Sequence, residues 1–430
     1  MKKFTPLFFI TILLLCSCKV KKIAWTHSSI DSQILKTQLS QEFIPEEDYV
    51  KLSDLAKVDS DAGLVRIQKR PDTAKTSAAF RQKLGYATVK IFYGTDRNRI
   101  TRPDHSVSFG TETVAESNKY FVGYTLVTIP DDHTEGEIDK PHYYKLQFRK
   151  TPKNSMIEKS IVSLSDQDFD AMIKNSSANT DAFIFVHGFN NSFEDAALRT
   201  AQLSRDINYP MTPFMYSWAS NGKTAAYEKD GISISAATPF FVDFIKRIAK
   251  NSQYKRLHII AHSMGNRLVA TALLQLSSSP DLKNINIDEL VMAAPDIDTL
   301  TFKTQYVVPL SLCCRRVTIY GAKNDWALKA SNIIGSYMRV GQYSKPPFYV
   351  DGAKNMDFIN ADSVKTDFLG HDRFAQSTTI LEDMTKLLST DKDPVARKVP
   401  SEPIQRHVYY YFRPERTGWI HDLFYFLDSW

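Results

Sequence analysis

The sequence predicts an α/β protein with a mainly parallel sheet, helices on both faces and an antiparallel leading edge. Short apolar segments typical of buried strands alternate with helix-like segments from residue 182 to residue 390. Strand-like segments at 89–95, 120–129 and 143–149 precede this region, and we expect them to form the antiparallel edge. Apolar residues make up 43% of the 430-residue chain, which is enough for a well-filled core.

The first central strand is expected at 182–186, and it ends in the loop His187-Gly188-Phe189-Asn190-Asn191. An amphipathic helix follows at 193–207. A His-Gly loop between a strand and the first helix commonly offers one backbone N–H to an oxyanion, and here we expect the amide of Phe189 to do so. We expect His187 to shape this loop rather than to transfer protons.

Two further features before the next strand bear on the same region. Asp96 and Arg97 follow the first strand-like segment and form either a buried ion pair near the site or a solvated turn. Between residues 218 and 256 we expect a helix at about 240–250, preceded by a polar loop that contains Tyr227 and Asp230. A second-layer helix is favoured there over a lid.

The clearest functional pattern is a strand, a serine and a helix in succession. An apolar strand at 257–261 reaches Ser263, and a helix-like pattern continues from residue 268 to residue 276. Ala261 and Gly265, two positions to either side of the serine, are small enough for a very tight turn. This is the context of a nucleophile elbow, so we expect Ser263 to be an activated nucleophile and the amide of Met264 to be the second oxyanion donor.

A histidine must follow such a serine along the chain, after an acid. Only His371, His407 and His421 come late enough, and the last two lie in an unusual C-terminal segment. His371 lies in a loop between a strand-like segment at 356–361 and a final helix at 378–388. We therefore expect His371 to be the general base.

The acid is expected after the strand at 316–321, where Asp325 is the first choice. Asp296, with Asp298 beside it, follows the preceding strand and remains the alternative acid. A serine, a histidine and an acid in these roles predict acyl transfer through a covalent acyl-enzyme.

Together these motifs resemble the bacterial alpha/beta hydrolases grouped as domain of unknown function nine hundred. The resemblance extends from about residue 86 to about residue 390 and implies an alpha/beta-hydrolase fold with an esterase-like or lipase-like activity, but it does not specify a substrate. From the acyl-transfer chemistry we expect an ester or lipid-like substrate. Ala219 departs from the family pattern, in which we expect a proline, and this affects only local loop geometry. The matching segments are residues 89–98, 187–203, 215–220, 261–267, 293–298 and 369–371.

The first 18 residues are typical of a bacterial lipoprotein signal peptide. Lys2 and Lys3 precede an apolar core at 7–15 that is too short to span a bilayer. Ser17 lies before Cys18, so we expect cleavage to leave Cys18 as a lipidated N-terminus that anchors the protein in a membrane of the cell envelope, inner or outer. A plain secretory signal is the alternative.

The rest of the chain divides into segments of different composition. Residues 19–85 are polar and predict a tether or accessory segment before the catalytic domain at 86–390. Residues 391–407 contain three prolines and many charges and predict a linker, whereas residues 408–430 form a tail with nine aromatic residues among 23. The tail either packs across the domain and hides an apolar patch, or dips into a membrane or binds a partner.

Several function classes are excluded by what the sequence lacks. The net charge of +6 is spread along the chain, and no basic-aromatic run suggests nucleic acid. Phosphate-binding and zinc-binding motifs are also missing, so we expect no cofactor and no metal. Two alternatives remain open: a non-enzymatic lipoprotein scaffold that binds a partner or envelope polymer, and an acyltransferase or peptidase with the same triad.

Overall fold

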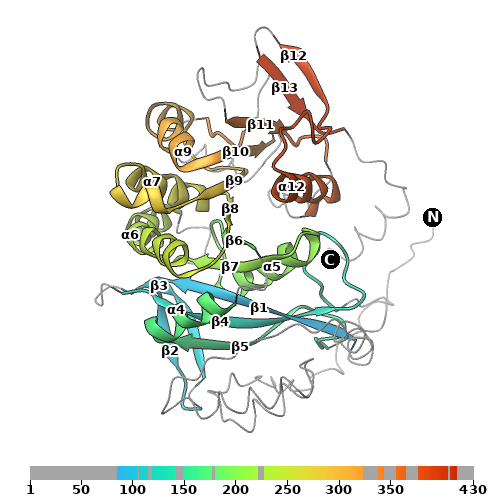
Figure 1. Ribbon diagram of the computed structural model, residues 1–430. Helices are drawn as coiled ribbons and strands as arrows, with labels where there is room; N and C mark the ends of the chain where they lie inside the picture. The colour runs from blue at the N-terminus through green and yellow to red at the C-terminus, as the bar shows by residue number, and fades with distance from the viewer. Residues whose placement is uncertain are drawn as a thin grey trace, which may run out of the picture.

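A sheet runs through the centre of the molecule with helices on both sides (Figure 1). The computed structural model describes residues 85–104, 106–114, 119–141, 149–176, 180–220, 227–322, 338–342, 355–364, 376–404 and 407–413. No helix in these ranges combines the length and the apolar composition that crossing a bilayer requires.

Seven neighbouring strands form the parallel centre of the sheet. In spatial order these are β1 (Tyr86–Thr95), β7 (Met211–Ser217), β6 (Asp181–Val186), β8 (Arg256–His262), β9 (Ile287–Ala293), β10 (Cys314–Gly321) and β11 (Met356–Asn360). Strands of this kind, buried on both faces, are continuous apolar segments, which is why the sequence predicts β1, β6, β8, β10 and β11 within a few residues.

The antiparallel leading edge is formed by β4 (Phe121–Pro130) and β5 (Ile157–Leu164), which follow β1 in the sheet. A separate two-stranded sheet contains β2 (Arg97–Thr101) and β3 (Val107–Thr113). The mainly parallel sheet with an antiparallel edge is therefore confirmed. Most of the strand predicted at 143–149 lies outside the described residues, and β5 occupies the edge position instead.

Alternate residues of the central strands point to opposite faces of the sheet. Ile184 and Val186 belong to one apolar core, whereas Phe183 and Phe185 belong to another. The first core is covered by α4 (Asp166–Asn175), α6 (Tyr227–Asn251), α7 (Gly265–Ser277) and α9 (Val307–Cys313), and the opposite face by α5 (Phe193–Asp206) and α12 (Thr378–Thr390) (Figure 1). The described residues also form three short helical turns, which are η3 (Pro280–Asn284), α8 (Thr299–Thr301) and η4 (Phe302–Tyr306).

Helix α6 is more than twice as long as the sequence predicts. It contains Tyr227 and Asp230, which were expected in a polar loop, and it continues through Pro239. A proline inside a helix removes a hydrogen bond and usually ends the helix. Here Ala237 and Phe241, on either side of the proline, are fully buried in the core, and this packing outweighs the break.

Two strands extend the sheet beyond residue 390. β13 (His407–Tyr411) pairs in parallel with β11, and β12 (Ser401–Ile404) pairs with β13 in the antiparallel direction. The segment expected to be a linker therefore contains a strand, and the start of the aromatic tail joins the core. The signal peptide predicted at 1–18, all but the last residue of the polar segment predicted at 19–85, and residues 414–430 lie outside the described residues.

The order of the central strands creates a switch point between β6 and β8. The chain leaves β6 through α5 to reach β7 on one side, and it later reaches β8 on the other side. The loops at the carboxyl ends of β6 and β8 therefore diverge to opposite faces of the sheet. Ligands of open α/β sheets bind in the crevice that opens at such a point.

Candidate active site

Ser263 lies in the tight turn between β8 and α7, at the carboxyl end of the sheet. Its φ is 51°, in the left-handed region that side chains other than glycine rarely adopt, and the residue is only 4% exposed. The backbone N–H of Ser263 donates to Ala293 O (2.9 Å), and Ser263 O accepts from the side chain of Asn266 (3.0 Å). Such strain persists only where surrounding bonds hold it, and it is concentrated at functional sites.

The loop after β6 lies directly against this turn because two glycines allow it. A Cβ on Gly265 would overlap the carbonyl oxygen of His187 and lie 2.8 Å from Val186 O. A Cβ on Gly188 would lie 2.9 Å from Cβ of Ser263. The two sequence motifs, more than 70 residues apart, therefore meet at a distance that only glycine permits.

The two expected oxyanion donors lie beside this contact, since Phe189 follows Gly188 and Met264 follows Ser263 in the sequence. Within the described ranges, neither backbone N–H has a hydrogen-bond acceptor. The neighbouring groups do have partners: Asn190 N donates to Ser220 Oγ (2.9 Å), and Asn191 Nδ2 donates to Phe189 O (2.8 Å). Asn190 adopts a φ of 59°, so the loop turns sharply after Phe189.

His187 is a neutral, buried support of this loop. Its ring stacks on Trp218 with centroids 5.0 Å apart, and Trp218 Nε1 donates to His187 O (2.8 Å). Nδ1 of His187 lies 2.8 Å from Gly188 O, so this nitrogen carries the proton. Burial and the nearby Arg97 guanidinium lower the pKa of His187 to about 3.

Asp96 and Arg97 are both fully buried behind the loop, which rules out the solvated turn. Burial raises the pKa of Asp96 to about 7 although the charge of Arg97 opposes this shift. Neither carboxylate oxygen of Asp96 has a hydrogen-bond donor among the described residues. Burial also lowers the pKa of Arg97, to about 10, so the arginine stays charged at neutral pH.

Asp296, the alternative acid, lies next to the serine turn and already has strong partners. Its N–H donates to Ser263 O (3.2 Å). Its carboxylate accepts from Arg267 Nη2 (3.0 Å), Arg339 Nε (3.1 Å) and the hydroxyl of Tyr227. The Tyr227 ring in turn contacts the Phe189 ring, with centroids 5.5 Å apart, so α6 reaches the oxyanion loop. The sequence did not indicate this contact because Tyr227 was expected in a loop.

The structure thus places four of the expected site residues close together: Ser263, Met264, Phe189 and Asp296. Asp325 and His371 lie outside the described residues, as does Cys18. Arg97, Ser220 and Tyr227 support the site as well, and only the charged pair at 96–97 left a signal in the sequence.

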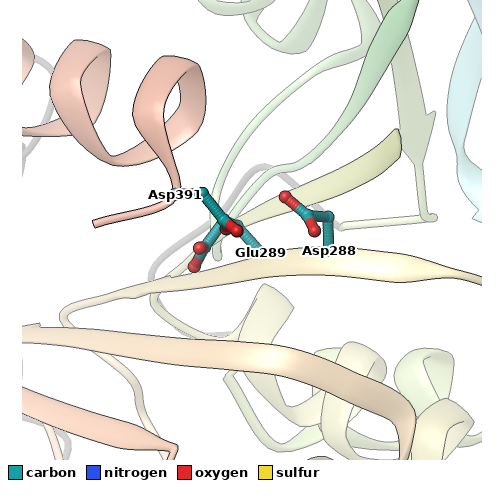
Figure 2. A group of neighbouring side chains, drawn as sticks. All are labelled: Asp288, Glu289 and Asp391. Carbon is teal, nitrogen blue, oxygen red and sulfur yellow. The ribbon is translucent and has the colours of Figure 1, made fainter. Parts of the chain in front are cut away.

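At the opposite end of β9, one group of three carboxylates in the described residues lies close enough to share a ligand. Oxygen atoms of Asp288, Glu289 and Asp391 are within 4.8 Å of one another (Figure 2). Arg315 pairs with all three carboxylates, and its Nε lies 2.7 Å from Asp288 Oδ1. The guanidinium therefore balances much of the negative charge that a cation would otherwise neutralise.

Comparisons with known proteins identify the family to which the chain belongs. A family model described as "Alpha/beta hydrolase of unknown function (DUF900)" matches residues 164–390. A candidate cell surface hydrolase of Lactobacillus plantarum WCFS1 is similar at 11% identity and a TM-score of 0.31, over 51% of this chain and 96% of that one. An inhibited esterase B of Lactobacillus rhamnosis is similar at 10% identity and a TM-score of 0.32, over 62% of this chain and 92% of that one. The comparison with curated proteins gives no match.

Proposed function

The chain belongs to the family of alpha/beta hydrolases of unknown function, and from this membership we propose that it is a serine hydrolase of the carboxylesterase or lipase type. The observation that carries this proposal is the backbone of Ser263. A serine with a φ of 51°, at the end of a central strand and beside the switch point, is the geometry of a nucleophile elbow. The substrate class that fits is an ester or a lipid-like ester.

The proposed reaction proceeds in two acyl-transfer steps. Ser263 Oγ attacks the ester carbonyl while His371 accepts the hydroxyl proton, and the amides of Phe189 and Met264 donate to the oxyanion. The C–O bond then breaks, and the alcohol leaves with the proton from His371. Water, deprotonated by His371, attacks the acyl-enzyme and releases the acid and Ser263.

Asp325 remains our choice for the acid that orients His371. Asp296 is the alternative, but two arginines and a tyrosine already donate to its carboxylate. A carboxylate with that many donors is a weak acceptor for a histidine N–H and a better brace for the serine turn. We therefore expect Asp325→Asn to reduce the rate of acyl-enzyme formation far more than Asp296→Asn does in the folded fraction.

The test is covalent labelling combined with ester hydrolysis by the full-length chain. A fluorophosphonate probe should label the wild type, and p-nitrophenyl esters from C2 to C16 should be hydrolysed with an optimum that reports the size of the acyl pocket. Ser263→Ala should abolish both. Ser235→Ala, an exposed serine on α6, is the matched control and should leave both unchanged. Wild-type protein that neither labels nor hydrolyses any ester would exclude a serine hydrolase.

We further propose that Cys18 is lipidated and anchors the enzyme in the cell envelope, with residues 19–85 as the tether. The support is the sequence of residues 1–18 alone. Several acyl chains bind a bilayer firmly, since each buried CH₂ contributes about 0.8 kcal/mol. Expression with a labelled fatty acid should mark the wild type and not Cys18→Ala, and the variant should leave the membrane fraction. Equal labelling of both would contradict the anchor.

A further inference from the structure

The guanidinium of Arg97 has all five of its N–H groups paired, although the side chain is fully buried. The five acceptors lie on three separate parts of the chain. Nε donates to Ser217 Oγ (2.8 Å), Nη1 to Gly110 O (3.0 Å) and Ser220 O (3.3 Å), and Nη2 to Asn191 O (2.6 Å) and His187 Nε2 (3.3 Å). A guanidinium has five N–H donors in a rigid planar fork, so this pocket uses its full capacity.

These acceptors connect the oxyanion loop to its surroundings. Asn191 and His187 are the two ends of the loop after β6, whereas Ser217 and Ser220 lie at the end of β7 and just beyond it. Gly110 belongs to β3. One side chain therefore fixes the loop both to the neighbouring parallel strand and to the small two-stranded sheet.

Arg97 also fixes the orientation of the His187 ring. Nδ1 of His187 faces Gly188 O and must carry the proton, so Nε2 can only act as an acceptor. Arg97 Nη2 and the hydroxyl of Ser217, itself bound to Arg97 Nε, both lie 3.3 Å from Nε2. Burial together with the guanidinium lowers the pKa of His187, which keeps this tautomer neutral. The ring is thereby held between Arg97 on its edge and Trp218 on its face.

A second chain of bonds supports the far side of the same loop. Asp230 accepts from Ser220 Oγ (2.6 Å), which in turn accepts from Asn190 N (2.9 Å). Since Arg97 also binds Ser220 O, both chains meet at this residue. The residues before and after Phe189 are held, while its own N–H stays without an acceptor in the described structure.

We propose that Arg97 is a positioning residue for hydrolysis, which holds the oxyanion loop so that the Phe189 amide faces the reacting carbonyl. This inference rests on the proposed function. Oxyanion donors accelerate a reaction because they are aimed before the charge develops. A buried cation is costly, and an apolar core of similar volume would stabilise the fold as well. Two bonds to the ends of the oxyanion loop and three to the segments around it therefore indicate a geometric role.

The test compares Arg97→Gln and Arg97→Lys with Arg397→Gln in the full-length protein. Arg397 is the matched control because it is also a buried arginine, paired through Nε (2.8 Å) with Asp383 of α12. With p-nitrophenyl butyrate, both Arg97 variants should lower kcat by about 10- to 100-fold with little change in KM. Lysine keeps the charge but cannot bind five acceptors, so it should not restore the rate. Arg397→Gln should keep the wild-type kcat in its folded fraction.

Hydrogen exchange of the peptide that contains residues 187–192 gives a readout that does not depend on activity. Exchange there should be at least about 10-fold faster in the Arg97 variants than in Arg397→Gln. Equal exchange, or a kcat within twofold of the control, would overturn the inference. Arg97→Lys keeps a cation beside Asp96 and decides the question if Arg97→Gln does not fold. A wild type without labelling or hydrolysis would instead refute the proposed function, and the exchange result would still decide whether Arg97 holds the loop.

Discussion

Two glycines set the distance between the turn that contains Ser263 and the loop after β6. At Gly265 a side chain would meet the backbone of Val186 and His187, which cannot rotate away as the end of a flexible side chain could. At Gly188 it would meet Cβ of Ser263 itself. A single methyl group at either position would therefore move Ser263 away from the donors proposed for its reaction.

We predict that Gly265→Ala lowers the fluorophosphonate labelling rate by about 100-fold, because displacement of reacting groups by about 1 Å costs that much. The free energy of unfolding should fall by about 1–3 kcal/mol, the usual cost of overpacking. A time course of labelling gives the labelling rate, and urea denaturation separately gives the free energy of unfolding.

Gly231→Ala is the control for the same substitution elsewhere. Gly231 lies in α6, and a Cβ there would have no neighbour within 4 Å. Alanine should leave the labelling rate unchanged and raise the free energy of unfolding by about 0.5–1 kcal/mol. If Gly265→Ala labelled as fast as Gly231→Ala, the close contact would have no catalytic meaning.

At this scale the sequence predicts what is local and misses what is distant. Ser263 was predicted to be the nucleophile because a serine between small residues, a strand and a helix is a pattern within a few positions. The role of Arg97 was not, since its five acceptors are 13 to 123 positions away along the chain. The local sequence around Asp96 and Arg97 does not indicate which loop the pair contacts.

Among the elements, the segment after β4 is fastened to the end of α5 by a histidine between two carboxylates. His133 Nδ1 lies 2.5 Å from Asp139 Oδ2, and Nε2 lies 2.8 Å from Asp206 Oδ1. Both ring nitrogens must donate to carboxylates, so the imidazole is charged. Although burial lowers it, the pKa of His133 is raised to about 9 by these two partners.

The pairing of His133 with Asp139 and Asp206 predicts that the free energy of unfolding falls as the pH rises. The folded state binds the proton more tightly than the unfolded chain, whose histidine pKa is about 6.5. Protonated His133 therefore contributes its full stabilisation below pH 6.5. This contribution to the free energy of unfolding, on the order of 2 kcal/mol, is lost as the pH rises through about 9. Urea denaturation of the wild type at several pH values between 6 and 10 should show this decline.

The matching variant is His133→Gln, which cannot change charge. Its free energy of unfolding should be lower than that of the wild type at pH 6, and the difference should shrink toward pH 10. If the two proteins differed by the same amount at both ends of this range, the ring would not be charged in the folded protein. Asp139 and Asp206 remain in both proteins, so their own effects cancel in the difference.

The elements themselves were predicted with uneven success, and the reason is tertiary packing. Central strands such as β6 and β8 are short apolar segments and were found within one residue of their true bounds. Helix α6 was predicted too short because Gly231 and Pro239 normally oppose helix formation. Burial of one face of the helix against the sheet overrides both residues, and that burial cannot be read from the local sequence.

For the whole molecule, the sheet crosses the boundary that composition suggested at residue 390. Phe412 is only 4% exposed, stacks near Tyr320 with centroids 6.1 Å apart, and donates its N–H to Asn360 O (3.0 Å). Tyr409, 3% exposed, belongs to the opposite core. Prolines and charges at 391–407 predict a linker. The pairing of β13 with β11 joins positions about 50 residues apart, and local composition does not encode such a pairing.

We therefore predict that Phe412→Ala destabilises the whole domain rather than freeing a tail. Truncating a buried phenylalanine costs about 3–5 kcal/mol, and the loss should appear in one cooperative transition that also reports the environment of Trp218. Val408→Ala, on the same strand but 45% exposed, should change the free energy of unfolding by no more than about 0.5 kcal/mol. A separate early transition in Phe412→Ala, with the main transition unmoved, would mean that β12 and β13 unfold independently. Because β13 covers the edge of β11 and contributes to both cores, we expect the single transition, and loss of fluorophosphonate labelling should then follow the same urea curve as loss of the fold.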